Sequence, residues 1–359
     1  MNKTGRTKYY ILMEIMKQEI LNGTIKAGEK LLSENELAKK YEVSRHTVRR
    51  ALSLLIEEGY VTAQQGRGNF CIDRFQIEKT KRILLLVREK ESVAVQHLLL
   101  GMKKELFRSG YELLIESTDN NVEKERYFIQ KALDRKIDGL IIEPSKSEIV
   151  CSHQQLYETL RYYGIPYLFI QGVYPGMRNQ DCILKDDYQA GYLATRYLIR
   201  QGHKKIVGIF SSDDHQGIEQ HKGYVKALEK VGISYHPEFI IWFHEEDRWK
   251  KPWIGVEELL KNNVPVEGII CQTDRIAREL MKNLEIIGKK IPEDISIIGN
   301  DLVEGKQKNL TMIFYHQQEI GEKVATILLH KIENKRTETV DMIIPPKLII
   351  GRTTKKRIL

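Results

Sequence analysis

Short apolar runs recur from residue 82 onward, and most are followed by an amphipathic stretch of helical length. The runs are ILLLV at 83–87, YELLIES at 111–117, GLIIEP at 139–144, PYLFIQG at 166–172, KIVGIF at 205–210, FIIWF at 239–243, GIICQT at 268–273 and ISIIGN at 295–300. Runs of this length that mostly lack polar residues are typical of strands buried on both faces of a parallel sheet. About nine or ten such strands exceed the usual size of one sheet, so the pattern predicts two doubly wound lobes with a cleft between them.

The first 72 residues have a different pattern, with short helices followed by a hairpin. A first helix is predicted over about 9–22, ended by Gly23. Ser33 and Glu36 have the spacing of a capping box, in which each side chain satisfies a backbone donor at a helix start. Ser44 stands where the N-cap of the next helix is expected, and that helix is predicted over 45–58 with an apolar stripe and a basic face.

A basic helix face taken alone is more often a solvated surface than a nucleic-acid contact. The segment after this helix favours the DNA interpretation. Residues 60–62 and 69–72 read as two strands, and the turn between them, QQGRG at 64–68, is rich in glycine and carries an arginine. A helix pair followed by such a wing places its second helix in the major groove, with the wing beside it.

The run from 9 to 72, with LLSENELAKKYEVSRHTVRRALSLLIEEGYV and QQGRGNF, resembles the winged helix of GntR-type transcription regulators. The resemblance implies contacts with operator DNA from the turn, the recognition helix and the wing. On this sequence the implied residues are Glu34, Ser44, Arg45, His46, Thr47, Arg49, Gln65, Gly66 and Arg67. Chemically, an arginine such as Arg45 can fork onto guanine, Glu34 can accept from cytosine, and Arg49 suits a phosphate.

Charge and cysteine usage agree with a DNA-binding protein inside the cell. Residues 1–74 contain 13 Lys/Arg and 9 Asp/Glu, so this fifth of the chain carries +4 of the formal net charge of +8. A basic excess of this kind steers association with nucleic acid. There is no apolar run of 18 residues and no signal-peptide pattern, which predicts a cytoplasmic protein. The four cysteines are scattered without a CxxC pair, so neither a metal nor another cofactor is expected.

Residues 82–359 carry a second resemblance. The stretches GHKKIVGIFSSDDHQGIEQHKGYVKALEKVGI, CQTDRIARELMKNLEIIGKKIPEDISIIGND and LTMI are similar to the LacI/GalR-type sugar-sensing domain, which is related to periplasmic binding proteins. A GntR-type head on such a body is the combination of the arabinose-repressor family, which LIIEPSKS at 140–147 and DDYQAGYLATRYLI at 186–199 also resemble. The predicted division is a DNA-binding domain over 1–73, a short hinge over 74–81 and an effector-binding and dimerisation domain over 82–359.

Ligands of doubly wound lobes bind beyond the carboxyl ends of the strands, so the polar residues just after each run and at the lobe crossings are the candidates. They are Glu143, Lys146, Gln171, Asp186, Gln220, Trp242, Thr273, Asp274, Asp301 and Tyr315. Carboxylates and amides would hold sugar hydroxyls, and Trp242 or Tyr315 would stack against the apolar face of the ring. Each position also suits a helix cap or a strand-end turn, and that alternative stays open.

Several candidates depart from the sugar-sensor pattern as the resemblance implies it. Gln220 stands where an arginine is usual and Thr273 where an asparagine is common, and Leu302 follows Asp301 in place of a second aspartate. The identity of the sugar is therefore open, because losing a bidentate arginine changes specificity. No GxSxG, GxxxxGK[ST], HExxH or strand-following GxGxxG motif is present, so an enzyme is not expected.

These observations together predict a repressor of sugar-utilisation genes that binds operator DNA as a homodimer and is released by a small sugar, L-arabinose or a related pentose. Two alternatives stay open. The chain could be a cytoplasmic sugar-binding protein without a DNA role, or a regulator whose ligand is a corepressor, a nucleoside or a phosphosugar. A corepressor strengthens DNA binding and an inducing sugar weakens it, so the sign of the coupling between ligand and DNA separates a corepressor from the predicted inducer.

Overall fold

The computed structural model describes residues 7–21, 23–72, 79–177, 179–300, 309–333 and 338–357. The chain divides into two compact units. The head unit comprises Met1–Arg82 together with Ile129–Gly139 and His153–Pro166, and the body unit comprises Ile83–Phe128, Leu140–Ser152 and Tyr167–Leu359. The predicted hinge residues 74–78 and the candidate Asp301 lie outside the described residues.

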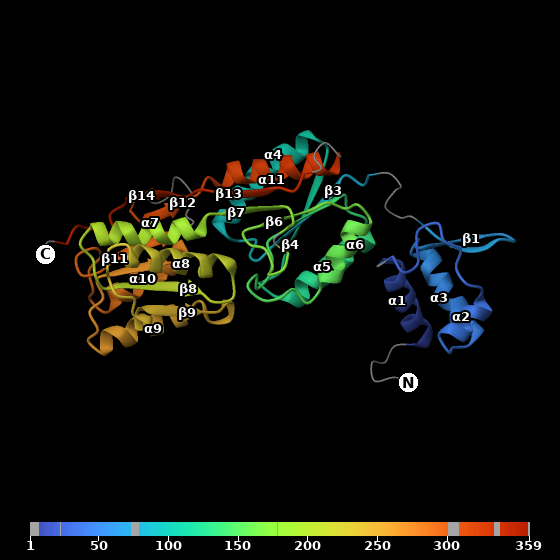
Figure 1. The fold of residues 1–359 in the computed structure, drawn as a ribbon, viewed down its shortest axis with the longest axis horizontal. Coiled ribbons are helices and arrows are strands. Elements are labelled where there is room, and N and C mark those ends of the chain that lie inside the picture. Colours follow the sequence, from blue (N-terminus) through green and yellow to red (C-terminus); the bar gives the residue numbers. More distant parts are fainter. Residues whose placement is uncertain are drawn as a thin grey trace. The chain divides into compact units, whose positions relative to one another are not determined.

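The head unit contains the predicted winged helix (Figure 1). Its helices are α1 (Lys8–Leu21), α2 (Glu34–Lys40) and α3 (Arg45–Glu57), and the antiparallel strands β1 (Val61–Gln64) and β2 (Gly68–Cys71) form the wing. Met16, Val48 and Leu55 are fully buried and belong to the core that α1 and α3 share. This part of the predicted fold class is confirmed.

The local signals that start and end these elements are also present in the structure. The Glu36 backbone N–H donates to Ser33 Oγ at 3.3 Å, and Glu36 Oε2 accepts from the Ser33 N–H at 2.8 Å, which is the predicted capping box. The Ser44 hydroxyl accepts from the Thr47 N–H at 3.2 Å and so caps α3. In the wing turn Gly66 has φ of +73°, a conformation that glycine adopts without strain.

The body unit is built on two six-stranded sheets, one in each lobe. The first sheet has the order β13-β7-β6-β5-β3-β4, and its strands are β3 (Arg82–Val87), β4 (Glu112–Ser117), β5 (Gly139–Ile142), β6 (Tyr167–Ile170), β7 (Cys182–Lys185) and β13 (Asp341–Ile344). The second has the order β14-β12-β11-β10-β8-β9, with β8 (Ile206–Ser211), β9 (Ile240–Phe243), β10 (Gly268–Cys271), β11 (Ser296–Asn300), β12 (Thr311–Phe314) and β14 (Lys347–Ile349). The strand pairs run parallel except β12 with β14, among the pairs whose register is described.

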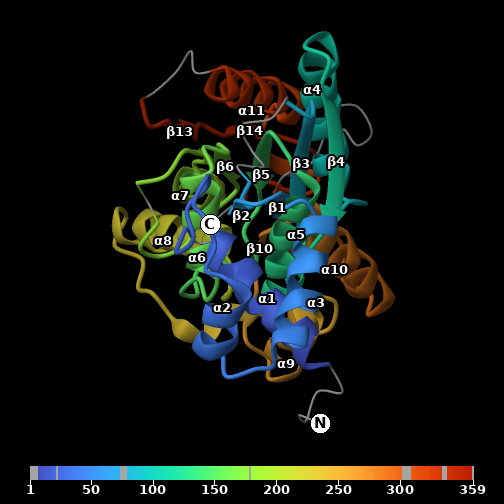
Figure 2. The ribbon, with the colours of Figure 1, turned by 90° about the vertical axis from the view of Figure 1, so that its right-hand side faces the viewer.

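Helices cover these sheets as the βαβ pattern predicts. In the first lobe α4 (Val93–Arg108) and α11 (Gln317–Ile332) lie side by side (Figures 1 and 2). In the second lobe α7 (Asp187–Arg200) and α8 (His215–Glu229) pack against one face of the sheet, and α9 (Lys251–Lys261) and α10 (Asp274–Ile286) against the other. Side chains of β8 alternate between these two cores, with Phe210 in one and Ile209 in the other. The remaining helices, α5 (Val122–Arg135) and α6 (Gln154–Tyr162), come after β4 and β5 in the chain.

The chain passes between the lobes after β7, after β12 and again between β13 and β14. All eight apolar runs form strands, so that prediction is confirmed. Four strands, β7, β12, β13 and β14, were not among the predicted apolar runs, and β13 and β14 consist of exposed and half-exposed positions only. No helix in the described part of the chain is long and apolar enough to cross a bilayer.

Candidate functional site

The first candidate surface is the basic face of α3 with the wing tip. The side chains of Arg45 and Arg49 are 62% and 64% exposed, and His46, Gln65, Gly66 and Arg67 are exposed as well. Glu34 at the start of α2 accepts two bonds from Arg49, Nε to Oε1 at 3.1 Å and Nη2 to Oε2 at 2.8 Å. Arg49 thereby lowers the pKa of Glu34, and Arg45 adds a weaker attraction at 3.9 Å.

This pairing has a chemical consequence for DNA binding. In the free protein Glu34 holds the guanidinium of Arg49 in place, and it neutralises a charge that a phosphate would otherwise attract. Ser44 and Thr47 are bound to each other through their hydroxyls at 2.9 Å, so both serve the helix start. Every predicted DNA-binding residue thus lies on α3 or at its N-cap, at the start of α2 or on the wing, and their contacts with DNA stay predictions.

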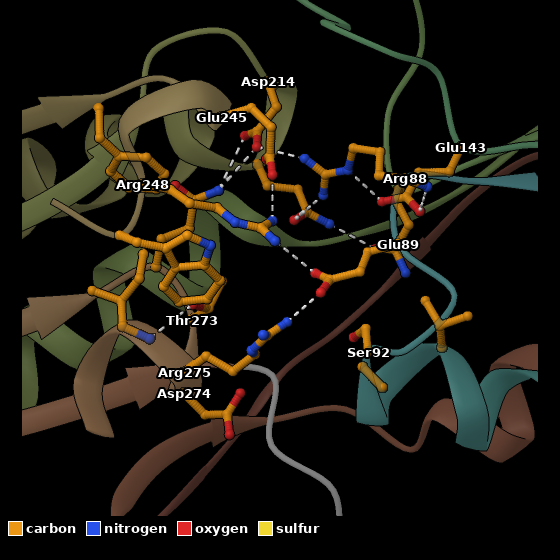
Figure 3. A pocket seen from close by; sticks show the side chains of 18 residues that line it. Arg88, Glu89, Ser92, Glu143, Asp214, Glu245, Arg248, Thr273, Asp274 and Arg275 are labelled. Atoms are coloured by element: carbon orange, nitrogen blue, oxygen red, sulfur yellow. Dashed lines mark hydrogen bonds and ion pairs between the residues drawn. The ribbon is translucent and has the colours of Figure 1, made fainter. Parts of the chain in front are cut away.

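The second candidate site is a cavity between the two lobes of the body unit, with a volume of about 120 Å³ (Figure 3). Its polar lining comes from the carboxyl ends of strands in both lobes. Arg88 and Glu89 follow β3, Glu143 follows β5, and Gln171 follows β6, while Asp214 and Gln272 come from the loops after β8 and β10. Ligand pockets more commonly measure about 300–1,000 Å³. The cavity is small because charged side chains of the protein itself extend across it.

Arg88 lies at the centre of these side chains (Figure 3). Its Nε donates to Glu143 Oε1 at 2.6 Å in its own lobe, and its Nη1 donates to Asp214 Oδ2 at 2.7 Å in the other lobe. Nη2 donates to Gln216 Oε1 at 3.3 Å. Burial opposes the positive charge, but the two carboxylates outweigh burial and raise the pKa of Arg88. The guanidinium is therefore a permanent cation held by one carboxylate from each lobe.

Further hydrogen bonds join the remaining strand ends to this cation. The Gln272 amide donates to Asp214 Oδ1 at 3.1 Å, and the Gln216 amide donates to Gln171 Oε1 at 2.7 Å. Asp214 also caps α8 by accepting from the Gly217 N–H at 2.7 Å. These side chains consequently form one connected hydrogen-bond network. Hydrogen bonds are stronger in the low dielectric of a protein interior, so such a network is rigid.

A second set of charges lies across the cavity mouth. Glu89 of the first lobe accepts from Arg248 Nη2 at 3.0 Å and from Arg275, and both arginines belong to the second lobe (Figure 3). Each guanidinium carbon lies 4.6 Å from the ring of Trp249. Burial acts to raise the pKa of Glu89, but Arg275 and Arg248 outweigh it and hold that pKa below its ordinary value. We call Glu89, Arg248 and Arg275 the mouth clasp.

More cross-lobe contacts are made by residues just after β5. Lys146 Nζ is 2.7 Å from Glu246 and 3.9 Å from Asp213, and Glu246 raises the pKa of Lys146. His215 Nδ1 is 3.0 Å from Glu148 Oε1. Burial opposes protonation of His215, but Glu148 outweighs it, so its pKa is raised. The two lobes are therefore also in contact through charged groups that lie outside the cavity lining.

The structure brings only part of the predicted effector set together. Glu143, Gln171, Thr273 and Asp274 line the cavity, and Lys146 makes the cross-lobe ion pair just described. Thr273 is also the N-cap of α10, so the cap alternative applies to it without excluding a ligand contact.

The other candidates lie elsewhere. Asp186 caps α7 and the Tyr315 hydroxyl donates to its backbone carbonyl at 3.1 Å. Gln220 is buried and donates to Asp187 at 2.9 Å. Trp242 packs on His221, with ring centroids 4.8 Å apart. None of these four residues is among the described side chains that line the cavity.

Sequence reasoning missed Arg88, Glu89, Asp214, Gln216, Arg248, Arg275 and Gln272 as cavity residues. Arg88 and Glu89 could have been predicted, because they directly follow the apolar run ILLLV and the other candidates were chosen for following such runs. Asp214 was visible in the SSDD loop after the fifth run. Arg248 precedes α9 in a short irregular segment, where periodicity gives no indication of orientation.

Comparisons with known proteins agree with this geometry. Residues 9–71 match the model of the bacterial regulatory proteins of the gntR family, and residues 80–352 match that of the periplasmic binding proteins and sugar binding domain of the LacI family. The arabinose metabolism transcriptional repressor of Halalkalibacterium halodurans is 33% identical over 97% of this chain and 96% of its own length. The chain belongs to this repressor family.

The same kind of repressor from Geobacillus stearothermophilus is 32% identical over 97% of this chain and 98% of its own. Among solved structures, a LacI family regulator from Enterococcus faecium with bound ribose covers 77% of this chain and 100% of its own, with a TM-score of 0.66 and 24% identity, which shows the fold. The protein is thus a transcriptional repressor with a DNA-binding GntR-type head and a sugar-binding LacI-type body, and the predicted absence of enzymatic function is confirmed.

Proposed function

We propose that this repressor controls genes of arabinose or related pentose use, and that L-arabinose or a related pentose enters the cavity and releases the operator. The observation that carries the proposal is the cavity itself, since strand ends from both lobes present carboxylates, amides and a guanidinium to one small space. Such groups pair with the hydroxyls of a sugar. The names of the two arabinose repressors support the same effector.

The charge of the cavity favours a neutral sugar over a phosphosugar. The described lining holds five carboxylates, on Glu89, Glu143, Asp214, Glu245 and Asp274, against three guanidinium groups. A phosphate dianion would add to a net negative charge in a partly buried site, where like charges repel strongly. A polyhydroxylated ligand without charge meets no such penalty, and this separates the effector proposed here from the phosphosugar alternative.

The proposed mechanism is thermodynamic linkage. An effector that stabilises one lobe geometry changes operator affinity only to the extent that the heads bind DNA differently in that geometry. The coupling free energy is typically about 1–3 kcal/mol, and it acts equally on sugar and DNA affinities. DNA binding itself is assigned to the exposed face of α3 and the wing, within a head over 1–73 that a hinge over 74–81 joins to a body over 82–359.

We place the working repressor in the cytoplasm as a homodimer on a roughly palindromic operator, because two heads related by twofold symmetry read two half-sites. Exposed apolar side chains support a dimer. On α4, Leu100 and Phe107 are 55% and 84% exposed, and Ile286 at the end of α10 is 81% exposed. Leu100 and Phe107 are seven residues apart and therefore lie on one face of α4, which a second protomer would cover in the proposed dimer.

A fluorescence anisotropy titration tests the proposal. The full-length protein is titrated onto duplexes that it selects from a random library, with and without L-arabinose, D-xylose and D-ribose. We expect one pentose to weaken binding at least about fivefold, which corresponds to the lower end of typical coupling energies. A sugar that strengthens binding would support the corepressor alternative, and no effect of any sugar would refute induction.

Arg45→Ala separates the repressor from a sugar-binding protein without a DNA role. The substitution should weaken specific DNA binding by about 1–3 kcal/mol and leave sugar binding unchanged. The matched control is Arg126→Ala, because Arg126 forms an exposed ion pair with Glu123 on α5, in the body unit, and the charge change is the same. Equal DNA binding by both variants would contradict the assignment of α3.

A further inference from the structure

We propose that Arg88 determines which sugar this repressor recognises, by donating its guanidinium fork to two neighbouring hydroxyl oxygens of a neutral sugar. The inference rests on the proposed function, since it concerns the same cavity, and it adds the specificity-determining residue. In the sequence, the departures from the sugar-sensor pattern at Gln220, at Thr273 and after Asp301 left the identity of the sugar open. In the structure Gln220 is turned toward Asp187 and does not line the cavity.

The placement of Arg88 supports this role. It directly follows β3, and its guanidinium lies between carboxylates of the two lobes, at 2.6 Å from Glu143 and 2.7 Å from Asp214. The other two arginines of the lining, Arg248 and Arg275, bind Glu89 at the mouth and flank Trp249. Among the arginines that line the cavity, Arg88 is therefore the one paired with buried carboxylates of both lobes (Figure 3).

The hydrogen-bonding capacity of Arg88 also supports the role. A guanidinium has five N–H donors in a fixed plane. Its side-chain contacts with described residues use one N–H on each of the three nitrogens. Each Nη retains a second N–H, so the planar group can donate to two further oxygens of a bound sugar.

Glu143 and Asp214 complete the recognition of such a diol. They hold the guanidinium plane fixed, so little conformational freedom is lost when a ligand binds. Each carboxylate can also accept the proton of a sugar hydroxyl whose oxygen accepts from Arg88. A sugar with one hydroxyl missing or inverted leaves a buried donor and a buried acceptor without a partner, and sites of this kind discriminate strongly.

The test is Arg88→Lys in the full-length protein. Lysine keeps a cation between the two carboxylates but removes the planar fork, so the fold is retained while the bidentate contact is lost. Binding of L-arabinose, D-xylose and D-ribose is measured by calorimetry, together with the 2-deoxy and 3-deoxy forms of the tightest binder. The control is Arg126→Lys, and thermal melting reports the fold of each variant.

The wild type should bind one pentose and lose at least about tenfold in affinity for one of its deoxy forms, which corresponds to one lost hydrogen bond to a charged group. Arg88→Lys should bind the parent sugar more weakly than the wild type by a similar factor. It should bind that deoxy form with almost the same affinity as the wild type does. If Arg88 only braced the lobes, the variant would weaken parent and deoxy sugars equally, and that result would overturn the inference while the proposed function stood.

Two other outcomes are equally decisive. If Arg88→Lys bound every sugar with the affinity of the wild type, the inference about Arg88 would be overturned and the proposed function would stand. A wild type that binds none of the pentoses would overturn the inference and the pentose effector together. If Arg88→Lys melts far below the wild type, the charge-balanced pair Arg88→Gln with Glu143→Gln replaces it, and the same loss of discrimination is expected.

Discussion

The mouth clasp leads to a prediction about lobe closure. Glu89→Gln removes the negative charge that two arginines of the other lobe share, while the size and shape of the side chain are kept. Both ion pairs of the mouth clasp join Glu89 of the first lobe to an arginine of the second lobe. Neutralisation of Glu89 should therefore shift the sugar-free protein toward more open lobes.

The size of this shift depends on the exposure of the three partners. Glu89 and Arg248 are 26% and 22% exposed, and a charge-assisted bond of this burial contributes about 1.5 kcal/mol. Arg275 is 46% exposed, so solvent screening leaves about 0.5 kcal/mol for its pair. The sum of about 2 kcal/mol corresponds to a roughly 30-fold change in the ratio of closed to open molecules.

Pulsed electron spin resonance can measure this ratio. One nitroxide is placed in each lobe, at Lys103→Cys on α4 and Lys261→Cys on α9, and labelled chains are diluted with unlabelled chains so that distances within one protomer dominate. The native cysteines are buried. The control is Glu279→Gln, which removes an exposed ion pair with Lys282 on α10. An unchanged distance distribution in Glu89→Gln, or a wild type that is already open without sugar, would refute the role of the clasp.

Three further predictions concern the rest of the chain. Glu34→Gln frees Arg49 for a phosphate, so affinity for nonspecific DNA should rise and the slope of log K against log salt should steepen by about 0.9 in anisotropy titrations. Lys17→Met removes the buried cation that pairs with Glu58 and Asp134, and the free energy of unfolding of the head unit should fall by about 1–2 kcal/mol in chemical denaturation. Burial lowers the pKa of His203, so the native state binds a proton there at lower pH than the unfolded chain, in which a histidine has a pKa near 6.5. The contribution of His203 to stability is fully present above about pH 6.5 and is lost as the pH falls below it. His203→Gln should therefore reduce the change of melting temperature between pH 7 and pH 5.

Much of the fold was readable from the sequence, because it depends on local signals. Ser33, Glu36 and Ser44 cap helices through contacts three residues along the chain, and such spacing is visible without a structure. Buried strands of parallel sheets are continuous apolar runs, as at 83–87 and 139–142. The edge strand β13 was missed, because its exposed and half-exposed positions make it resemble a loop in the sequence.

The cavity was less readable, because position after a strand identifies only part of its lining. Thr273 lies just after β10 and lines the cavity, whereas Gln220 lies within α8 and turns toward Asp187. Arg248 reaches the cavity from the irregular turn before α9, and its partner Glu89 is 159 positions away in the sequence. Pairs of this separation leave no periodic trace in a single sequence.

The consecutive residues Arg88 and Glu89 have different expected roles: Glu89 affects lobe closure, and Arg88 affects discrimination between sugars. A repressor whose lobes close firmly without sugar would gain nothing from its effector, since a ligand shifts only the population that is not yet closed. Partly exposed ion pairs such as those of Glu89 are weak enough to leave that equilibrium adjustable. Arg88 lies deeper, where a lost hydrogen bond is costly, so it suits discrimination between sugars. We therefore expect Glu89→Gln to change the affinity for every bound sugar by one common factor, whereas Arg88→Lys should change their order of preference.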